Sequence, residues 1–165
     1  MGEFAATDRL AAVRLREDRP RARTPEIQHE LDLAIYDLTE ENRFRIPGRA
    51  DSDPPAGPYE LAIGMADRML VIEVATEAGE PVTAFHLSLS PLRGVIKDYF
   101  AICESYFDAV KRLPPSRIEA IDMGRRGVHN EGARILVERL EGKIETDTDT
   151  ARRLFTVICA LQFRG

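Results

Sequence analysis

Alternating apolar and polar residues in the first half of the chain predict β-strands. In residues 9–16, Ala11, Val13 and Leu15 share one face of an extended segment. The same two-residue period recurs in three later segments, at 59–63, 68–76 and 81–90. Because the connections between these three segments are short, we expect them to form an antiparallel meander.

Apolar residues at three- and four-residue steps predict helices in the rest of the chain. One helix is expected over 25–41, with Thr24 as its N-cap, and another over 91–113. A last helix should follow Asp147 or Asp149, and its apolar residues lie on more than one side, which indicates the most buried helix. The order of elements predicts an α+β domain, with about four to five helices packed mainly on one face of the sheet.

The segment IDMGRRGVHNEG, residues 121–132, interrupts this regular pattern with glycines and charged side chains. If residues 117–141 formed one helix, its three glycines would each cost about 1 kcal/mol relative to alanine, roughly 3 kcal/mol in all. The apolar residues would also fail to keep to one stripe. We therefore predict a helix to about Met123, a tight loop GRRGVH, and a new helix capped by Asn130.

This 124–130 loop is the best candidate for a binding site. The free N–H groups and the positive dipole end of the new helix would lie beside cationic side chains, a combination that suits phosphate, carboxylate or an acidic partner. The candidate anion-binding residues are Arg125, Arg126, His129 and Asn130. The plainer interpretation is a turn whose arginines pair with Asp122 and Glu131. Both interpretations stay open at this point.

Composition bounds the class of protein. A chain of 165 residues with 44% hydrophobic residues is the size of one domain, so we expect a single domain over 1–165. Within it we expect a disordered tail over 1–8 and an exposed, mobile loop over 47–58. The net charge of −5 disfavours nucleic-acid binding, although a basic run keeps that function as a third hypothesis. This run consists of Arg14, Arg16, Arg19, Arg21 and Arg23.

Cysteine usage and hydropathy predict a cytoplasmic protein. Cys103 and Cys159 each fall within an apolar helical pattern, as reduced core thiols do. We find no secretory signal in the opening residues and no apolar run long enough to span a membrane.

Motifs for catalysis, metals and cofactors are absent from the sequence. It contains no P-loop and no GxSxG, and HELDLA, which begins at His29, lacks the second histidine of a zinc helix. The leading hypothesis is therefore a non-catalytic binding or regulatory domain without metal or cofactor. This hypothesis includes a homodimer that pairs through a sheet edge. Its rival is a small-molecule enzyme with a dispersed site, built from His129 and Glu131 with Asp98 or His86.

Five segments together carry a family resemblance. They are RTPEIQHELDLAIYDLTEENRF, GPYELAIG, LSLSPLRGVIKDYFAICESYFDAV, PSRIEAIDMGRRGVHNEGARIL and DTDTARRLFTVICAL. Over residues 23–161 the chain resembles a family of small uncharacterised bacterial proteins, most of them alphaproteobacterial. The resemblance implies a cytoplasmic protein with no assigned activity, cofactor or site residue.

Overall fold

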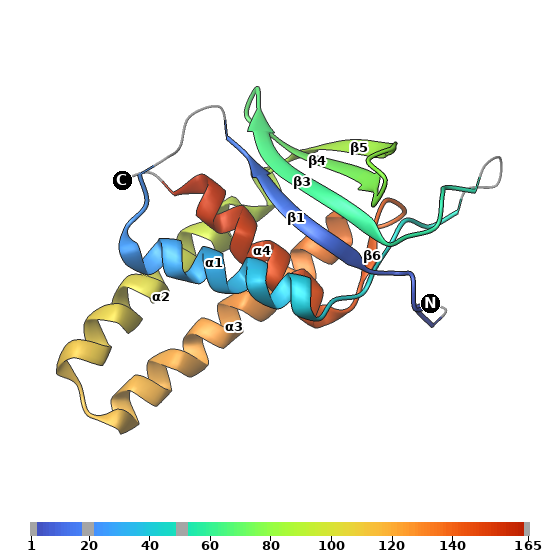
Figure 1. Ribbon diagram of the computed structural model, residues 1–165. Coiled ribbons are helices and arrows are strands. Elements are labelled where there is room, and N and C mark those ends of the chain that lie inside the picture. The colour runs from blue at the N-terminus through green and yellow to red at the C-terminus, as the bar shows by residue number, and fades with distance from the viewer. Residues whose placement is uncertain (1–2, 18–21, 49–52, 164–165) are drawn as a thin grey trace.

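The computed structural model describes residues 3–17, 22–48 and 53–163, and they form a sheet with helices on one side (Figure 1). The strands of the main sheet are β1 (Leu10–Arg16), β3 (Tyr59–Ala66), β4 (Met69–Thr76) and β5 (Pro81–Ser88), in the order β1-β3-β4-β5. A short second ladder pairs β2 (Phe44–Arg45) with β6 (Glu145–Thr146).

The sheet is mixed, which corrects the prediction of an antiparallel meander. Strands β3, β4 and β5 do form such a meander. Strand β1, however, pairs with β3 in parallel. A parallel pair requires a crossover connection, and the helix and long connection between β1 and β3 supply it.

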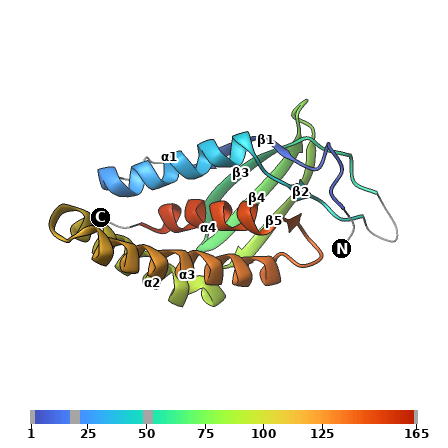
Figure 2. The ribbon, with the colours of Figure 1, turned by 90° about the horizontal axis from the view of Figure 1, so that it is seen from below.

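Four α-helices lie on the same side of this sheet within the described residues (Figure 1). They are α1 (Pro25–Glu40), α2 (Arg93–Arg112), α3 (Pro115–Arg139) and α4 (Thr148–Gln162), and a 3-10 turn, η1 (Ser90–Leu92), precedes α2. Seen from below, α4 lies between α1 and α3 (Figure 2). Helix α4 has more buried positions than any of the other helices, which confirms that it is the most buried one.

Helices α1 and α4 begin at N-caps that the sequence predicts, Thr24 and Asp147. The Thr24 hydroxyl accepts a hydrogen bond from the backbone N–H of Ile27 at 3.2 Å, and the Asp147 carboxylate accepts one from Thr150 at 3.0 Å. Each cap satisfies a backbone donor that a helix N-terminus leaves free.

Helix α3 is continuous from Pro115 to Arg139, so the predicted loop over 124–130 is wrong. Asn130 is an interior helical residue rather than an N-cap, and none of the three α3 glycines has a positive φ. Tertiary packing explains why the glycine cost is tolerated. A Cβ at Gly132 would lie 2.5 Å from carbons of the Phe155 ring, so this glycine lets α3 approach α4 closely.

Asn42 joins β1 to the end of α1 from a buried position. Its side-chain oxygen accepts a hydrogen bond from the Leu10 N–H at 2.6 Å, and its amide nitrogen donates to the Leu10 carbonyl at 3.0 Å. The same nitrogen donates to the carbonyl of Leu38. One side chain therefore satisfies three backbone groups at the junction of the sheet and the helical layer.

The described start of the chain contacts β2 through Phe4. Phe4 lies under the Arg45 guanidinium, with 4.7 Å between the guanidinium carbon and the ring centroid. Residues 1–2 and 49–52 lie outside the described residues, so the disordered tail over 1–8, the mobile loop over 47–58 and the single domain over 1–165 stay predictions. Within the described ranges, no helix has the length and apolar character needed to cross a membrane.

Candidate anion-binding site

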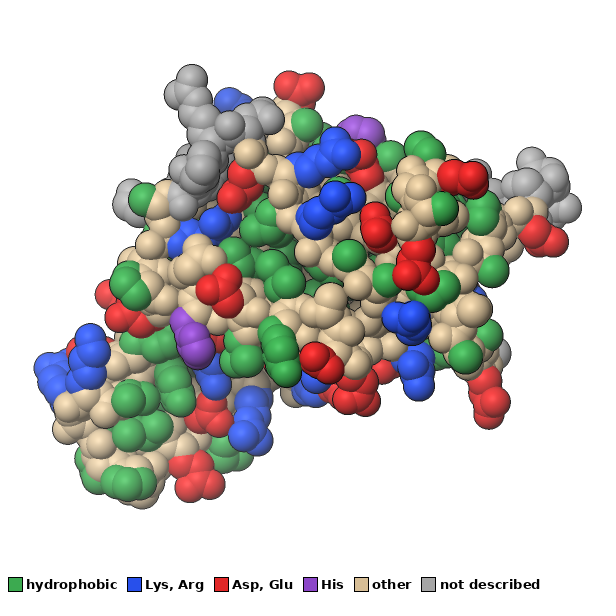
Figure 3. All heavy atoms as spheres, viewed as in Figure 1, with side chains coloured by type: hydrophobic (Ala, Val, Ile, Leu, Met, Phe, Trp, Pro, Cys, Tyr) green, Lys and Arg blue, Asp and Glu red, His purple; other side chains and the backbone are tan. Residues whose placement is uncertain are grey.

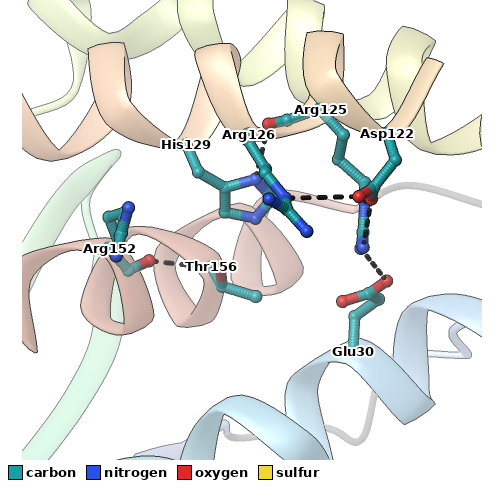
Figure 4. A network of polar contacts seen from close by, with 7 residues as sticks. All are labelled: Glu30, Asp122, Arg125, Arg126, His129, Arg152 and Thr156. Atoms are coloured by element: carbon teal, nitrogen blue, oxygen red, sulfur yellow. Dashed lines mark hydrogen bonds and ion pairs between the residues drawn. The ribbon is translucent and has the colours of Figure 1, made fainter. Parts of the chain in front are cut away.

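The arginines of α3 meet those of α4 in a pocket of about 350 Å³. The pocket is lined by Arg125, Arg126, His129, Arg152, Arg153 and Thr156. Figure 4 shows these side chains except Arg153, together with Asp122 of α3 and Glu30 of the neighbouring helix α1. Three of the four predicted residues therefore come together, although the backbone donors of a helix N-terminus take no part. The fourth, Asn130, is not among the residues that line the pocket. It accepts a hydrogen bond from Arg152 at 2.8 Å.

Arg125 is a structural bridge rather than a free cation. It donates to Glu30 of α1 at 3.0 Å and to Asp122 of its own helix at 2.9 Å. Its guanidinium carbon also lies 4.5 Å from the ring centroid of Tyr106 on α2. These contacts join α1, α2 and α3. Most of the guanidinium N–H donors of Arg125 are therefore already used in contacts within the protein and are not free for a ligand.

Arg126 and Arg153 keep donors for a ligand. The Arg126 side chain is 76% exposed, and its Nε lies 3.2 Å from an Asp122 oxygen. Arg153 donates through Nη1 to the Glu41 carbonyl at 2.8 Å. Within the described part of the chain, their remaining guanidinium N–H groups have no partner. A guanidinium with free N–H groups can bind an oxyanion through paired hydrogen bonds.

His129 forms the inner wall of the pocket. Its Nδ1 lies 2.8 Å from the Arg125 carbonyl oxygen. The ring packs edge-to-face against Tyr99 and Phe155, with centroids 5.3 Å and 6.2 Å away. Burial lowers the pKa of His129 below its usual value, against the opposing effect of the carbonyl hydrogen bond. The imidazole is therefore neutral near pH 7.

The two adjacent arginines should differ in their effect on stability. We expect Arg125→Ala to lower the free energy of unfolding by about 2 kcal/mol, because it leaves Glu30 and Asp122, which are 13% and 21% exposed, without this partner. Arg126→Ala should change it by less than about 0.5 kcal/mol, as for other exposed ion pairs. Urea unfolding of both variants measures the difference, and equal effects would contradict the structural role of Arg125.

Among the described residues, no hydrogen bond or ion pair joins the residues of the enzyme hypothesis to one another. Glu131 is exposed and pairs with Arg134 at 2.6 Å, which holds the pKa of Glu131 below its usual value. His86 on β5 and Asp98 on α2 are exposed. Within the described residues His129 has a carbonyl partner and no carboxylate partner. The described residues also contain no group of three or more His, Cys, Asp or Glu side chains that could hold a metal ion.

The basic run near the start of the chain is divided among carboxylates. Arg14 pairs with Glu60 at 3.5 Å, and Arg16 pairs with Glu73 at 3.0 Å. Arg23, whose side chain is 5% exposed, pairs with Glu17. Arg19 and Arg21 lie outside the described residues. On the face seen in Figure 3, side chains of both signs are interspersed. This pattern offers no continuous track for a phosphate backbone.

Fold and site together define an α+β protein with an arginine-lined pocket between two helices. The chain belongs to the Uncharacterised protein family (UPF0262), whose sequence model matches residues 7–164, and this confirms the resemblance seen in the sequence.

Similar proteins occur in alphaproteobacteria. A UPF0262 protein of Ruegeria sp. (strain TM1040) is 62% identical over 142 residues, covering 86% of this chain and 89% of that protein. One of Paracoccus denitrificans is 62% identical over 138 residues, covering 84% and 85%. One of Ruegeria pomeroyi is 57% identical over 157 residues, covering 95% and 98%. No solved structure gives a significant match.

Proposed function

We propose that this protein is a non-catalytic binding or regulatory domain that recognises an anion, or an acidic group of a partner, through the pocket between α3 and α4. One observation carries the proposal. Arg126 and Arg153 come from different helices, line the same pocket, and hold guanidinium N–H groups that no other described residue uses. Two such groups facing one space suit an oxyanion.

The charges around the pocket favour an anionic ligand. Its cations are Arg125, Arg126, Arg152 and Arg153, and the carboxylates paired with them are Glu30, Asp122 and Asp149. Asp122 serves both Arg125 and Arg126, so four cations share three carboxylates. The pocket therefore has an excess of positive charge that a bound anion would balance.

Sulfate binding provides a direct test. With a dissociation constant of about 1 mM, sulfate at about 20 mM stabilises the folded state by about 1.8 kcal/mol, a rise in melting temperature of roughly 4–7 °C. We expect Arg126→Ala combined with Arg153→Ala to abolish most of this rise. Arg125 is left intact because its loss would disturb the fold.

The matched control removes two exposed helical arginines elsewhere. Arg112→Ala with Arg134→Ala changes the net charge equally, and each of these arginines has an i, i+4 carboxylate partner at the surface. Sodium chloride at the same ionic strength accounts for screening. The site is refuted if the control pair loses as much of the sulfate effect as the pocket pair.

We also propose that the protein forms a homodimer and is located in the cytoplasm. Strand β5 ends the sheet order β1-β3-β4-β5, and an edge strand can pair with the same strand of a second copy to give a homodimer. The free cysteines Cys103 and Cys159 are both buried thiols, a state typical of the reducing cytoplasm.

A further inference from the structure

His129 places a hydrogen-bond acceptor among the cations of the pocket. The Arg125 carbonyl can only accept, so the His129 Nδ1 that lies 2.8 Å from it must carry the hydrogen. In the neutral ring the other nitrogen, Nε2, then holds a lone pair. Nε2 lies on the side of the ring away from that carbonyl (Figure 4), and no described residue donates to it.

The surroundings of His129 oppose a second proton on the ring. Each neighbouring element contributes ionisable groups: Arg125 and Arg126 on α3, Arg152 and Arg153 on α4, Glu30 on α1 and Tyr99 on α2. The arginines repel an imidazolium, and Glu30 alone among these groups attracts it. Burial between the Tyr99 and Phe155 rings adds a desolvation cost.

Thr156 supplies a second acceptor beside the histidine. Its hydroxyl donates to the Arg152 carbonyl at 3.2 Å, which leaves lone pairs of the oxygen available. Thr156 lines the same pocket as His129. The pocket thus combines donors from Arg126 and Arg153 with acceptors from His129 and Thr156.

On the basis of the proposed function, we infer that the ligand is an oxyanion that carries its own O–H group, on or next to the charged centre. The guanidinium groups of Arg126 and Arg153 bind the charged oxygens, and the ligand hydroxyl donates to Nε2 of His129. Hydrogenphosphate and hydroxycarboxylic acids share this chemistry. Sulfate and plain carboxylates lack the hydrogen, so their lone pairs would face that of Nε2.

Two pairs of dianions test this inference near pH 8. Hydrogenphosphate differs from sulfate, and malate from succinate, chiefly by one O–H group. We expect the member with the hydroxyl to bind about tenfold more tightly by calorimetry, because an unpaired acceptor costs about 1–3 kcal/mol. If the affinity ratio is larger for hydrogenphosphate over sulfate, the natural ligand is a phosphate. If it is larger for malate over succinate, the natural ligand is a hydroxycarboxylate.

His129→Phe is the matched variant, because phenylalanine keeps an aromatic ring against Tyr99 and Phe155 but has no acceptor. It should make the two members of each pair bind equally. The comparison within each pair on the wild-type protein does not depend on this variant, and so remains decisive if His129→Phe folds poorly.

Sulfate affinity of the wild-type protein should also depend on pH. A bound dianion offsets the surrounding arginines and raises the pKa of His129, so sulfate binding takes up a proton and strengthens as the pH falls from about 8 to about 5.5. The His129→Phe protein should lose this dependence.

The outcomes separate this inference from the proposed function. Equal binding within both pairs near pH 8, or sulfate binding that is independent of pH, overturns the role of His129 while an arginine-dependent site stands. Absence of binding by all four anions, or binding indifferent to Arg126 and Arg153, overturns the site itself.

Discussion

Replacing Gly132 with alanine should lower the free energy of unfolding by about 2 kcal/mol, even though alanine favours the helix by about 1 kcal/mol. The new Cβ would lie 2.5 Å from ring carbons of Phe155. That ring has no exposed surface, and it packs edge-to-face against Tyr99 with centroids 6.0 Å apart, so it cannot retreat. Either α3 must move away from α4 or the core must repack. Urea unfolding and the melting temperature measure the loss.

Gly127→Ala is the matched control in the same helix. Apart from its chain neighbours and the nearby backbone of its own helix, no described atom lies within 4 Å of a Cβ added at Gly127. Only the helix propensity changes, so the variant should gain up to about 1 kcal/mol. We expect Gly132→Ala to lower the free energy of unfolding and Gly127→Ala to raise it. If Gly132→Ala were as stable as Gly127→Ala, the close approach of α3 to Phe155 would be wrong.

Replacing Asn42 with leucine should lower the free energy of unfolding by about 3 kcal/mol. The side chain is 5% exposed and satisfies the N–H and carbonyl of Leu10 and the carbonyl of Leu38. Leucine is similar in size but leaves these buried groups without this partner, at about 1–3 kcal/mol for each that stays unsatisfied. Chemical unfolding gives the total loss, and faster hydrogen exchange at the Leu10 amide locates it.

The control for this substitution is Asn130→Leu on the exposed surface of α3. Asn130 makes a single side-chain hydrogen bond, to Arg152, so its loss should cost less than about 0.5 kcal/mol. A loss of similar size for both variants would show that Asn42 does not anchor β1. An unchanged exchange rate at Leu10 would lead to the same conclusion.

Local sequence patterns predicted most of the elements because they act over a few residues. The two-residue period located the strands of the meander, and Thr24 marked the start of α1. For α4 the sequence offered Asp147 or Asp149 as the N-cap, and the structure has Asp147. The parallel pairing of β1 with β3 could not be predicted in this way. It joins segments separated by more than forty residues, and strand periodicity carries no information on which strands pair.

The segment IDMGRRGVHNEG shows how a local rule can fail. By helix propensity, each of the three glycines destabilises a continuous helix. Only the tertiary structure shows that Gly132 lies against the Phe155 ring, where a larger residue would not fit. Contacts with α2 and α4 stabilise α3 by more than the propensity of its glycines opposes it, as happens for many helices in proteins. Arg125, Arg126 and His129 do line one pocket, but the expectation that the free backbone N–H groups of a helix N-terminus lie beside them was wrong.

The sequence by itself determined the α+β class, the buried character of α4, the family and the cationic residues from which a site could be built. The tertiary structure decided that Arg126 and Arg153 line one pocket, that Arg125 pairs with Glu30, and that Nδ1 of His129 lies against the Arg125 carbonyl. The physical reason is the range of the interactions. Periodicity and capping depend on neighbours within a few residues, whereas a pocket depends on the approach of helices that are distant in sequence.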